Sequence, residues 1–403
     1  MRRGIAVVVM GLLVWVAVAA GPSAAQAPLS IKVGAVVPLT GRYAAGGAQV
    51  RAGYEFAVED INRAGGVMVK EFNKKLPLAL VLQDDESDAT KTVARLESLA
   101  SDRVVAYLGG FGSDLHAAAS SIAEKNKIPY LGVAFALHKV HEQGFKYLFS
   151  PFEKSPDLSR DIYIFLNASL PAGQRPRRVA IFKEKTEWGD ELGGLWATRA
   201  TEFGYQAVVQ EEYAVGSRDV SDMVLRAKAA GVDAVFGIPT PPDGINLVRQ
   251  MRLLAFNAKF YLLIRAADAA GWSQNLGKDG DYVVLAPGWH YAMRYPGVKE
   301  LNEKHQRQFG RPADVIVGPA YANIQILADA ITRAGTLDRT KIRDAIAATN
   351  MMTVMGPVKF RPDGTGVVQT VFVQWQRGKQ ELVWPKEFAT APLAYPAPAW
   401  DQR

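Results

Sequence analysis

Cysteine is absent from all 403 residues of this sequence. Its absence excludes disulfide bonds, thiolate metal sites, cysteine nucleophiles and a lipid anchor attached to a cysteine. Histidine is scarce, and of the five histidines only His138 and His141 stand close together. Two residues at this spacing provide two metal ligands at best. We therefore expect no metal site and interpret the histidines as surface residues.

Long apolar runs are also lacking. The run Ile5–Ala20 is shorter than the roughly 18 residues that argue for a spanning helix. It follows Arg2 and Arg3 and precedes small residues, an arrangement typical of a secretory signal peptide. We predict a signal peptide over residues 1–25, with cleavage after Ala27 as the alternative. The mature chain is then expected in the periplasm, without a direct membrane anchor.

Charge of one sign is not concentrated anywhere along the chain. The formal net charge is +7, and basic residues cluster only briefly at Arg175, Arg177 and Arg178. Neither a nucleic-acid stripe nor a polybasic membrane patch is present, so we expect no nucleic-acid partner. We also expect a monomer. The residues that remain after cleavage exceed the roughly 250–300 at which single cores stop growing, which predicts two lobes.

Short β-branched runs alternate with helical patterns, which predicts an α/β fold with parallel sheets. Helical patterns cover 48–63, 89–99 and 298–309, among others. Strands are expected over residues 31–37, 78–82, 104–108, 179–182, 207–213, 234–238, 260–264 and 282–286, and then at 358–361 and 367–376.

Catalytic signatures of exported α/β enzymes are missing. The position two before Ser113 is Phe111, so no nucleophile elbow is formed. Gly110 and Gly112 begin a dinucleotide fingerprint, but Leu115 occupies its third glycine position. We expect no catalytic residue and no cofactor. The loops after the parallel strands remain, because open α/β sheets place ligands there.

One of these loops carries Ser113, which we predict at the N-cap of the next helix. Free backbone donors and the positive end of the helix dipole favour an anion at such a position. The alternative is that Ser113 only caps its own helix.

The chain resembles the periplasmic binding proteins for branched-chain amino acids, of the type I class. The resemblance lies in Gly34–Gly41, Asp60–Gly66, Gln83–Asp85, Glu187–Gly189, Leu247–Arg252 and Gly356–Val358. It implies two doubly wound parallel-sheet lobes joined by a three-strand hinge, one ligand bound in the cleft by hinge closure, and a membrane ABC permease as partner. The implied division is lobe 1 over 29–150 and 288–355, lobe 2 over 151–287 and 356–390, and an extended tail over 391–403.

The resemblance also assigns binding residues. In the family, a serine at the position of Ser113 and residues of the next loop hold the ligand carboxylate. Ala136 replaces the usual threonine, and backbone amides near Ala134 and Ala136 remain available. Where amino-acid binders carry an acid for the ligand ammonium, this chain has Arg265. An arginine beside an ammonium is unfavourable and suits a carboxylate instead, unless Arg265 faces solvent or pairs with Asp268.

The remaining binding positions concern the cavity wall. Trp188 stands where the family has a tyrosine that packs on the ligand, and Thr240 replaces an aromatic residue. Further wall candidates are Tyr43, Phe135, Trp289 and Tyr291. We therefore expect a small organic acid, with an aromatic carboxylate first and a short aliphatic or dicarboxylic acid second. Alternatives are a branched-chain or other amino acid on the same fold, or an exported enzyme of unrecognised type.

Overall fold

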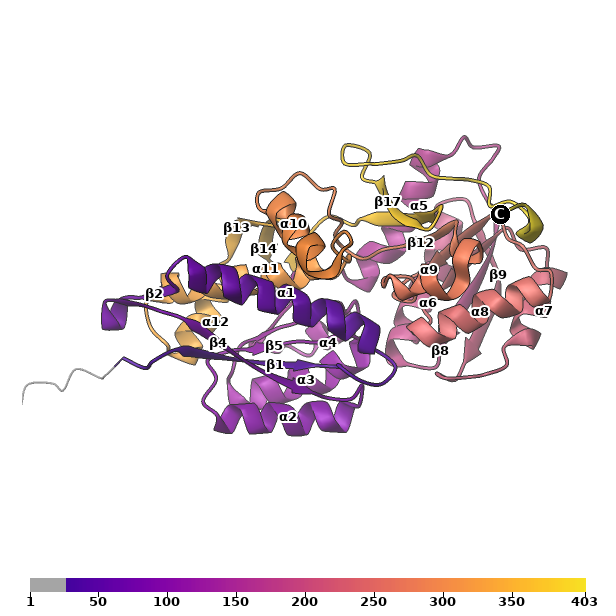
Figure 1. Ribbon diagram of the computed structural model, residues 1–403. Coiled ribbons are helices and arrows are strands. Elements are labelled where there is room, and N and C mark those ends of the chain that lie inside the picture. The colour runs from indigo at the N-terminus through magenta and orange to yellow at the C-terminus, as the bar shows by residue number, and fades with distance from the viewer. Residues whose placement is uncertain (1–26) are drawn as a thin grey trace, which may run out of the picture.

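The computed structural model describes residues 27–403, so the predicted signal peptide lies outside the described residues. Figure 1 shows two lobes side by side, each built around its own sheet. No helix within residues 27–403 combines the length and the apolar character needed to cross a membrane.

The first lobe is a parallel sheet with helices on both faces (Figure 1). Its strands in spatial order are β4 (Leu78–Asp84), β1 (Ile31–Val37), β5 (Tyr107–Leu108), β6 (Tyr130–Leu131) and β7 (Leu148–Phe149). Its helices are α1 (Ala44–Arg63), α2 (Ala89–Ser101), α3 (Ser113–Asn126), α4 (Lys139–Glu142), α10 (Val298–Phe309), α11 (Val317–Ala334) and α12 (Arg339–Ala347), and a hairpin of β2 (Val67–Val69) and β3 (Lys74–Leu76) follows α1.

The second lobe has a larger, mixed sheet. Its strands in spatial order are β17 (Lys379–Trp384), β16 (Phe372–Gln376), β12 (Val283–Leu285), β11 (Phe260–Leu263), β10 (Ala234–Gly237), β8 (Arg178–Glu184) and β9 (Gln206–Tyr213). The strands β16 and β17 are antiparallel to their neighbours, and the other neighbours are parallel. Its helices are α5 (Ser155–Ser169), α6 (Glu187–Glu202), α7 (Ser221–Ala229), α8 (Pro241–Leu253) and α9 (Gly271–Leu276).

Three chain crossings join the lobes, between β7 and α5, between β12 and α10, and before β16. The first crossing contacts the segment that leads to the third, because Ser150 and Thr365 form a parallel β-bridge. A small sheet of β13 (Asn350–Thr353), β14 (Gly356–Phe360) and β15 (Gly366–Val367) precedes the third crossing. The lobe boundary that the resemblance implies, between residues 355 and 356, falls between the paired strands β13 and β14.

The helices after the second crossing return to the first lobe. The amide of Ile316, just before α11, donates to Oε1 of Gln49 on α1 at 3.0 Å. The side chain of Asn323 on α11 donates to the carbonyl of Leu131 on β6 at 3.2 Å. Segments far apart in sequence thus close one hydrophobic core.

Most predicted elements are present, and some were missed. The expected strand 31–37 and helix 298–309 have the observed bounds of β1 and α10. The elements β6, β7, α5 and β17 were not expected. The tail, expected to be extended, ends in a short 3₁₀ helix at Trp400–Gln402, where the Trp400 indole donates to the carbonyl of Phe256 at 2.9 Å.

The first helix begins earlier than expected, at Ala44 rather than Ala48. The pair Gly46–Gly47 favours a loop because glycine is a poor helix former. Here close packing requires both glycines. A Cβ on Gly47 would lie 1.9 Å from the carbonyl oxygen of Pro38, and one on Gly46 would lie 2.5 Å from the Phe111 ring.

Asn62→Ala should lower the free energy of unfolding by about 1–3 kcal/mol, because it removes two hydrogen bonds between α1 and β4. The Asn62 side chain donates to the carbonyl of Leu78 at 2.9 Å and accepts from its amide at 2.8 Å. Urea unfolding measures the change. The exposed Gln143→Ala is the control, and equal midpoints for the two variants would contradict the prediction.

Candidate functional site

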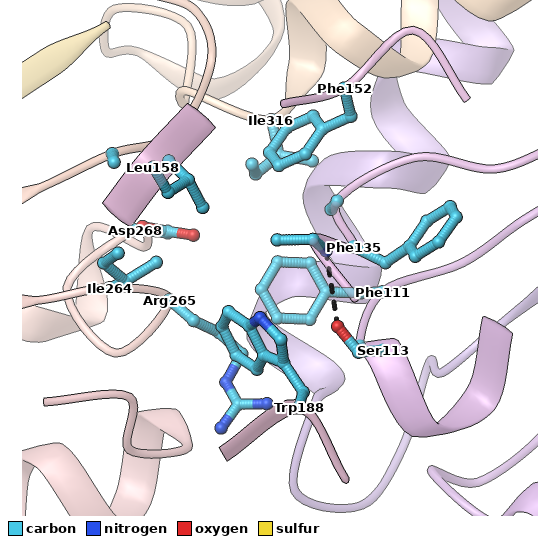
Figure 2. Close-up of a pocket in the computed structure, with 14 residues that line it drawn as sticks. Phe111, Ser113, Phe135, Phe152, Leu158, Trp188, Ile264, Arg265, Asp268 and Ile316 are labelled. Carbon is cyan, nitrogen blue, oxygen red and sulfur yellow. Dashed lines mark hydrogen bonds between the residues drawn. The ribbon is translucent and has the colours of Figure 1, made fainter. Parts of the chain in front are cut away.

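A cavity lies between the two lobes. Both lobes and the first crossing contribute to its wall, as Figure 2 shows. The lining residues are Phe111, Gly112, Ser113, Ala134, Phe135, Ala136 and Ile316 from the first lobe, Phe152 from the crossing, and Leu158, Trp188, Ile264, Arg265, Asp268 and Ala286 from the second lobe.

Six residues singled out from the sequence line this cavity together: Ser113, Ala134, Phe135, Ala136, Trp188 and Arg265. Three others, Tyr43, Thr240 and Trp289, are buried elsewhere. Thr240 caps α8 by accepting from the Asp243 amide at 3.4 Å, and the Trp289 indole donates to the carbonyl of Val354 at 2.9 Å. The further wall candidate Tyr291 packs on His290, with ring centroids 4.2 Å apart.

Ser113 is the first residue of α3, and Gly112 rather than Ser113 is the N-cap. Gly112 has φ of 106°, and a Cβ there would lie 2.7 Å from the Tyr43 ring. Oγ of Ser113 accepts from the amides of Ala136 and Leu137 at 3.3 and 3.4 Å. The hydroxyl hydrogen of Ser113 is therefore left to be donated elsewhere. Figure 2 shows this oxygen on the wall opposite Asp268.

His116 holds the two first-lobe loops together. Its Nδ1 lies 2.7 Å from the carbonyl of Gly112, and its Nε2 accepts from the Val133 amide at 3.3 Å. Burial lowers the pKa of His116 to about 3, so the imidazole is neutral and donates through Nδ1. The Phe135 ring lies between His116 and His141, with centroids 4.3 and 5.7 Å away.

Our interpretation of the histidines as surface residues was therefore wrong for most of them. His116, His141, His290 and His305 are all buried. Each ring accepts or donates a hydrogen bond with backbone, which offsets the cost of burying a polar ring. Only His138 retains substantial exposure.

Arg265 is buried and bonded to other groups of the protein. Its Nη2 lies 2.5 Å from Oε2 of Glu184 and donates to the carbonyl of Ile238 at 2.8 Å. Nε donates to the carbonyl of Pro239 at 3.3 Å, and Nη1 donates to Oη of Tyr43 at 3.2 Å. Arg265 therefore neither faces solvent nor pairs with Asp268, the two alternatives expected from the sequence. Its carboxylate partner is Glu184.

The ion pair of Glu184 and Arg265 removes the positive charge on which the organic-acid interpretation depended. Burial disfavours the charged guanidinium, but Glu184, Tyr43 and Asp114 together outweigh burial and raise the pKa of Arg265. The guanidinium lies 5.0 Å from the centroid of Trp188. Figure 2 shows it beyond the indole ring, pointing away from Asp268. Arg265 thus packs against Trp188 in the cavity wall, and the carboxylate of Glu184 balances its charge.

Asp268 presents the carboxylate that faces the cavity (Figure 2). Its side chain is buried, and among residues 27–403 Oδ1 has no hydrogen-bond partner. Burial raises the pKa of Asp268 to about 7, although the charge of Arg265 opposes that rise. A buried acceptor without a partner is costly, so this oxygen is suited to a donor brought by a ligand.

The indole of Trp188 offers a matching donor. Its Nε1 is buried and lacks a hydrogen-bond partner in the described part of the chain. Apolar side chains form the rest of the wall. In Figure 2, Phe152 and Ile316 lie at the end of the cavity opposite Trp188. The site therefore combines a donor, an acidic acceptor and an apolar end.

Sequence reasoning missed Asp268 and the apolar end as parts of the site. Asp268 was considered only as a partner for Arg265. Its position three residues after Arg265, in the same loop, was the signal that could have placed it in the site. Phe152 and Leu158 lie on and just after the first crossing, and Ile316 precedes α11. A cavity built from seven separate segments between residues 111 and 316 has no local pattern that identifies it.

Comparisons with known proteins agree with the fold. Residues 30–380 match the family described as periplasmic binding protein. The chain is 24% identical to Leu/Ile/Val-binding protein homolog 7 of Brucella abortus, over 93% of this chain and 96% of that protein.

Solved structures of type I periplasmic binding proteins share the fold. A leucine binding protein of Thermotoga maritima has a TM-score of 0.79 at 24% identity, covering 87% of this chain and 97% of that one. A solute binding protein of R. palustris in complex with benzoate has a TM-score of 0.76 at 16% identity, covering 92% and 97%. With two lobes, a cavity between them and a family match over most of its length, the chain belongs to the periplasmic binding protein family.

Proposed function

We propose that this chain is the substrate-binding component of an ABC importer and that it binds an α-amino acid with an apolar side chain. The observation that carries the proposal is the free carboxylate oxygen of Asp268 in the interlobe cavity. An ammonium group can supply the missing donor and a compensating charge. The names of the relatives, which refer to leucine, isoleucine and valine, support the same class of ligand.

The opposite wall suits the ligand carboxylate. It carries the hydroxyl of Ser113 and the start of α3, and the first amides of a helix have no partner within the helix. The indole N–H of Trp188 provides another donor. The side chain of the ligand would then lie against Phe152, Leu158 and Ile316. Each polar end of a zwitterion thus finds a group of the matching kind.

This proposal replaces the aromatic carboxylate expected from the sequence. That expectation required a free arginine fork, and Arg265 is paired with Glu184. An acid without an amine would also leave Asp268 unpaired beside a second negative charge. The benzoate complex of the R. palustris protein shows only that the same fold can hold an aromatic acid. Binding a solute for a membrane permease, rather than converting it, remains part of our proposal.

The amine requirement can be measured directly by calorimetry. L-Leucine should bind, whereas 4-methylpentanoate, which has the same skeleton without the amine, should bind at least about tenfold more weakly, because a charged hydrogen bond contributes about 1.5–3 kcal/mol. Benzoate serves as the third ligand. Equal or tighter binding of either acid would favour the organic-acid alternative, and turnover of any ligand would indicate an enzyme.

Asp268→Asn should weaken leucine binding by about 10- to 100-fold, because an amide cannot balance the ammonium charge. Asp222→Asn removes an exposed carboxylate on α7 of the same lobe and is the matched control. If both variants bind leucine as the unaltered protein does, Asp268 does not hold the ammonium group.

Leucine affinity should also depend on pH. The pKa of Asp268 is raised to about 7 without ligand, and an ammonium partner lowers it. Below about pH 7 the proton on Asp268 must leave before binding, so the affinity should fall by about tenfold per pH unit. Above that pH it should level off. Titration calorimetry from pH 5 to pH 8 tests this, and Asp268→Asn should show no such slope.

A further inference from the structure

A chain of polar contacts crosses the cleft beside the cavity. Nη1 of Arg265, in the second lobe, donates to Oη of Tyr43 at 3.2 Å. Tyr43 lies in the first lobe, and its hydroxyl donates to Oδ1 of Asp114 at 3.0 Å. Arg42 holds the other oxygen of Asp114 at 2.5 Å. We call Arg42, Tyr43, Asp114 and Arg265 the cleft latch.

The central atoms of the latch are shielded from water. Tyr43 is 1% exposed and Arg265 is 5% exposed. Burial raises the pKa of Tyr43 well above its ordinary value, so the phenol keeps its proton. It can therefore accept from Arg265 and donate to Asp114 at the same time. The guanidinium of Arg265 also lies 5.3 Å from the centroid of the Tyr43 ring.

A second contact between the lobes lies beside the loop of Ala134 and Ala136. The carboxylate of Glu191 on α6 accepts from the amides of His138 and Lys139 at 2.8 Å each. These amides lie at the start of α4, directly after the cavity loop. This second contact thus lies directly after one of the cavity loops of the first lobe.

Opening the cleft would break these contacts, which join groups of the two lobes directly. Tyr43 is also absent from the wall of the cavity, so its hydroxyl has no direct part in holding the ligand. Its Oη is nevertheless the acceptor that joins Arg265 to the first lobe. Removing this one oxygen would therefore weaken the closure of the lobes without changing the wall of the cavity.

We propose that Tyr43 is a positioning residue that latches the two lobes together through Arg265 and so sets how fast a bound ligand leaves. The latch favours the closed arrangement even without a ligand, with Glu191 as a second clasp. The effect on ligand release rests on the proposed function, because it requires a ligand in the cavity. The effect on the ligand-free protein does not.

The absence of cysteine allows a clean measurement, because two engineered thiols would be the only labelling sites. Ala94→Cys on α2 and Ala229→Cys on α7 replace exposed alanines, one in each lobe. Spin labels at both positions report the distance between the lobes by electron paramagnetic resonance. The distance is measured without ligand and with L-leucine.

Tyr43→Phe should shift the ligand-free distance distribution towards longer distances. It should also speed leucine dissociation by about tenfold, with little change in the association rate, because a hydrogen bond to a charged group is lost. An unchanged ligand-free distribution would overturn the latch. If the distribution shifts but leucine does not bind, the proposed function fails and the latch stands.

Tyr54→Phe is the matched control. Tyr54 is a buried tyrosine within the first lobe, and its hydroxyl donates to the carbonyl of Gly109 at 2.7 Å. This variant loses one hydrogen bond away from the lobe–lobe contacts. It should lower the melting temperature and leave the interlobe distances unchanged. An equal shift in both variants would mean that the effect of Tyr43→Phe is only a loss of stability.

Discussion

The buried ion pair of Glu184 and Arg265 is the interaction on which the interpretation of this protein depends. It converts a loop with a positive side chain into a neutral wall, and it holds the guanidinium against the indole of Trp188. With that charge balanced, Asp268 is left as the ionisable group that faces the cavity without a partner among the described residues. The carboxylate of Glu184 also orients Arg265 towards Tyr43. It therefore links the ligand site to the contacts between the lobes.

Much of the fold could be predicted from the sequence because its elements have regular patterns. Strand β1 and helix α10 have the expected bounds, and six predicted site residues line one cavity. Strands β6 and β7 have two residues each, which is too short for an alternating pattern. Helix α1 begins four residues earlier than expected, because Gly46 packs against Phe111 and Gly47 against Pro38. No local sequence rule contains such contacts.

The chemistry of the site was harder to predict than its location. Arg265 could be placed in a binding loop, but its partner Glu184 lies 81 residues away in sequence. Whether a charged side chain is free or paired depends on such distant contacts. The histidines show the same limit, because His116 and His141 look like ordinary polar residues until the stack with Phe135 is known.

If the proposed function holds, the latch has a consequence for energy use by the permease. A permease that responds to the closed shape would treat an empty, latched protein as a loaded one and would hydrolyse ATP without moving cargo. The contacts between the lobes must therefore be weak enough for the unloaded protein to reopen often. A contact that passes through one tyrosine hydroxyl meets this requirement, since it steadies the closed shape without locking it.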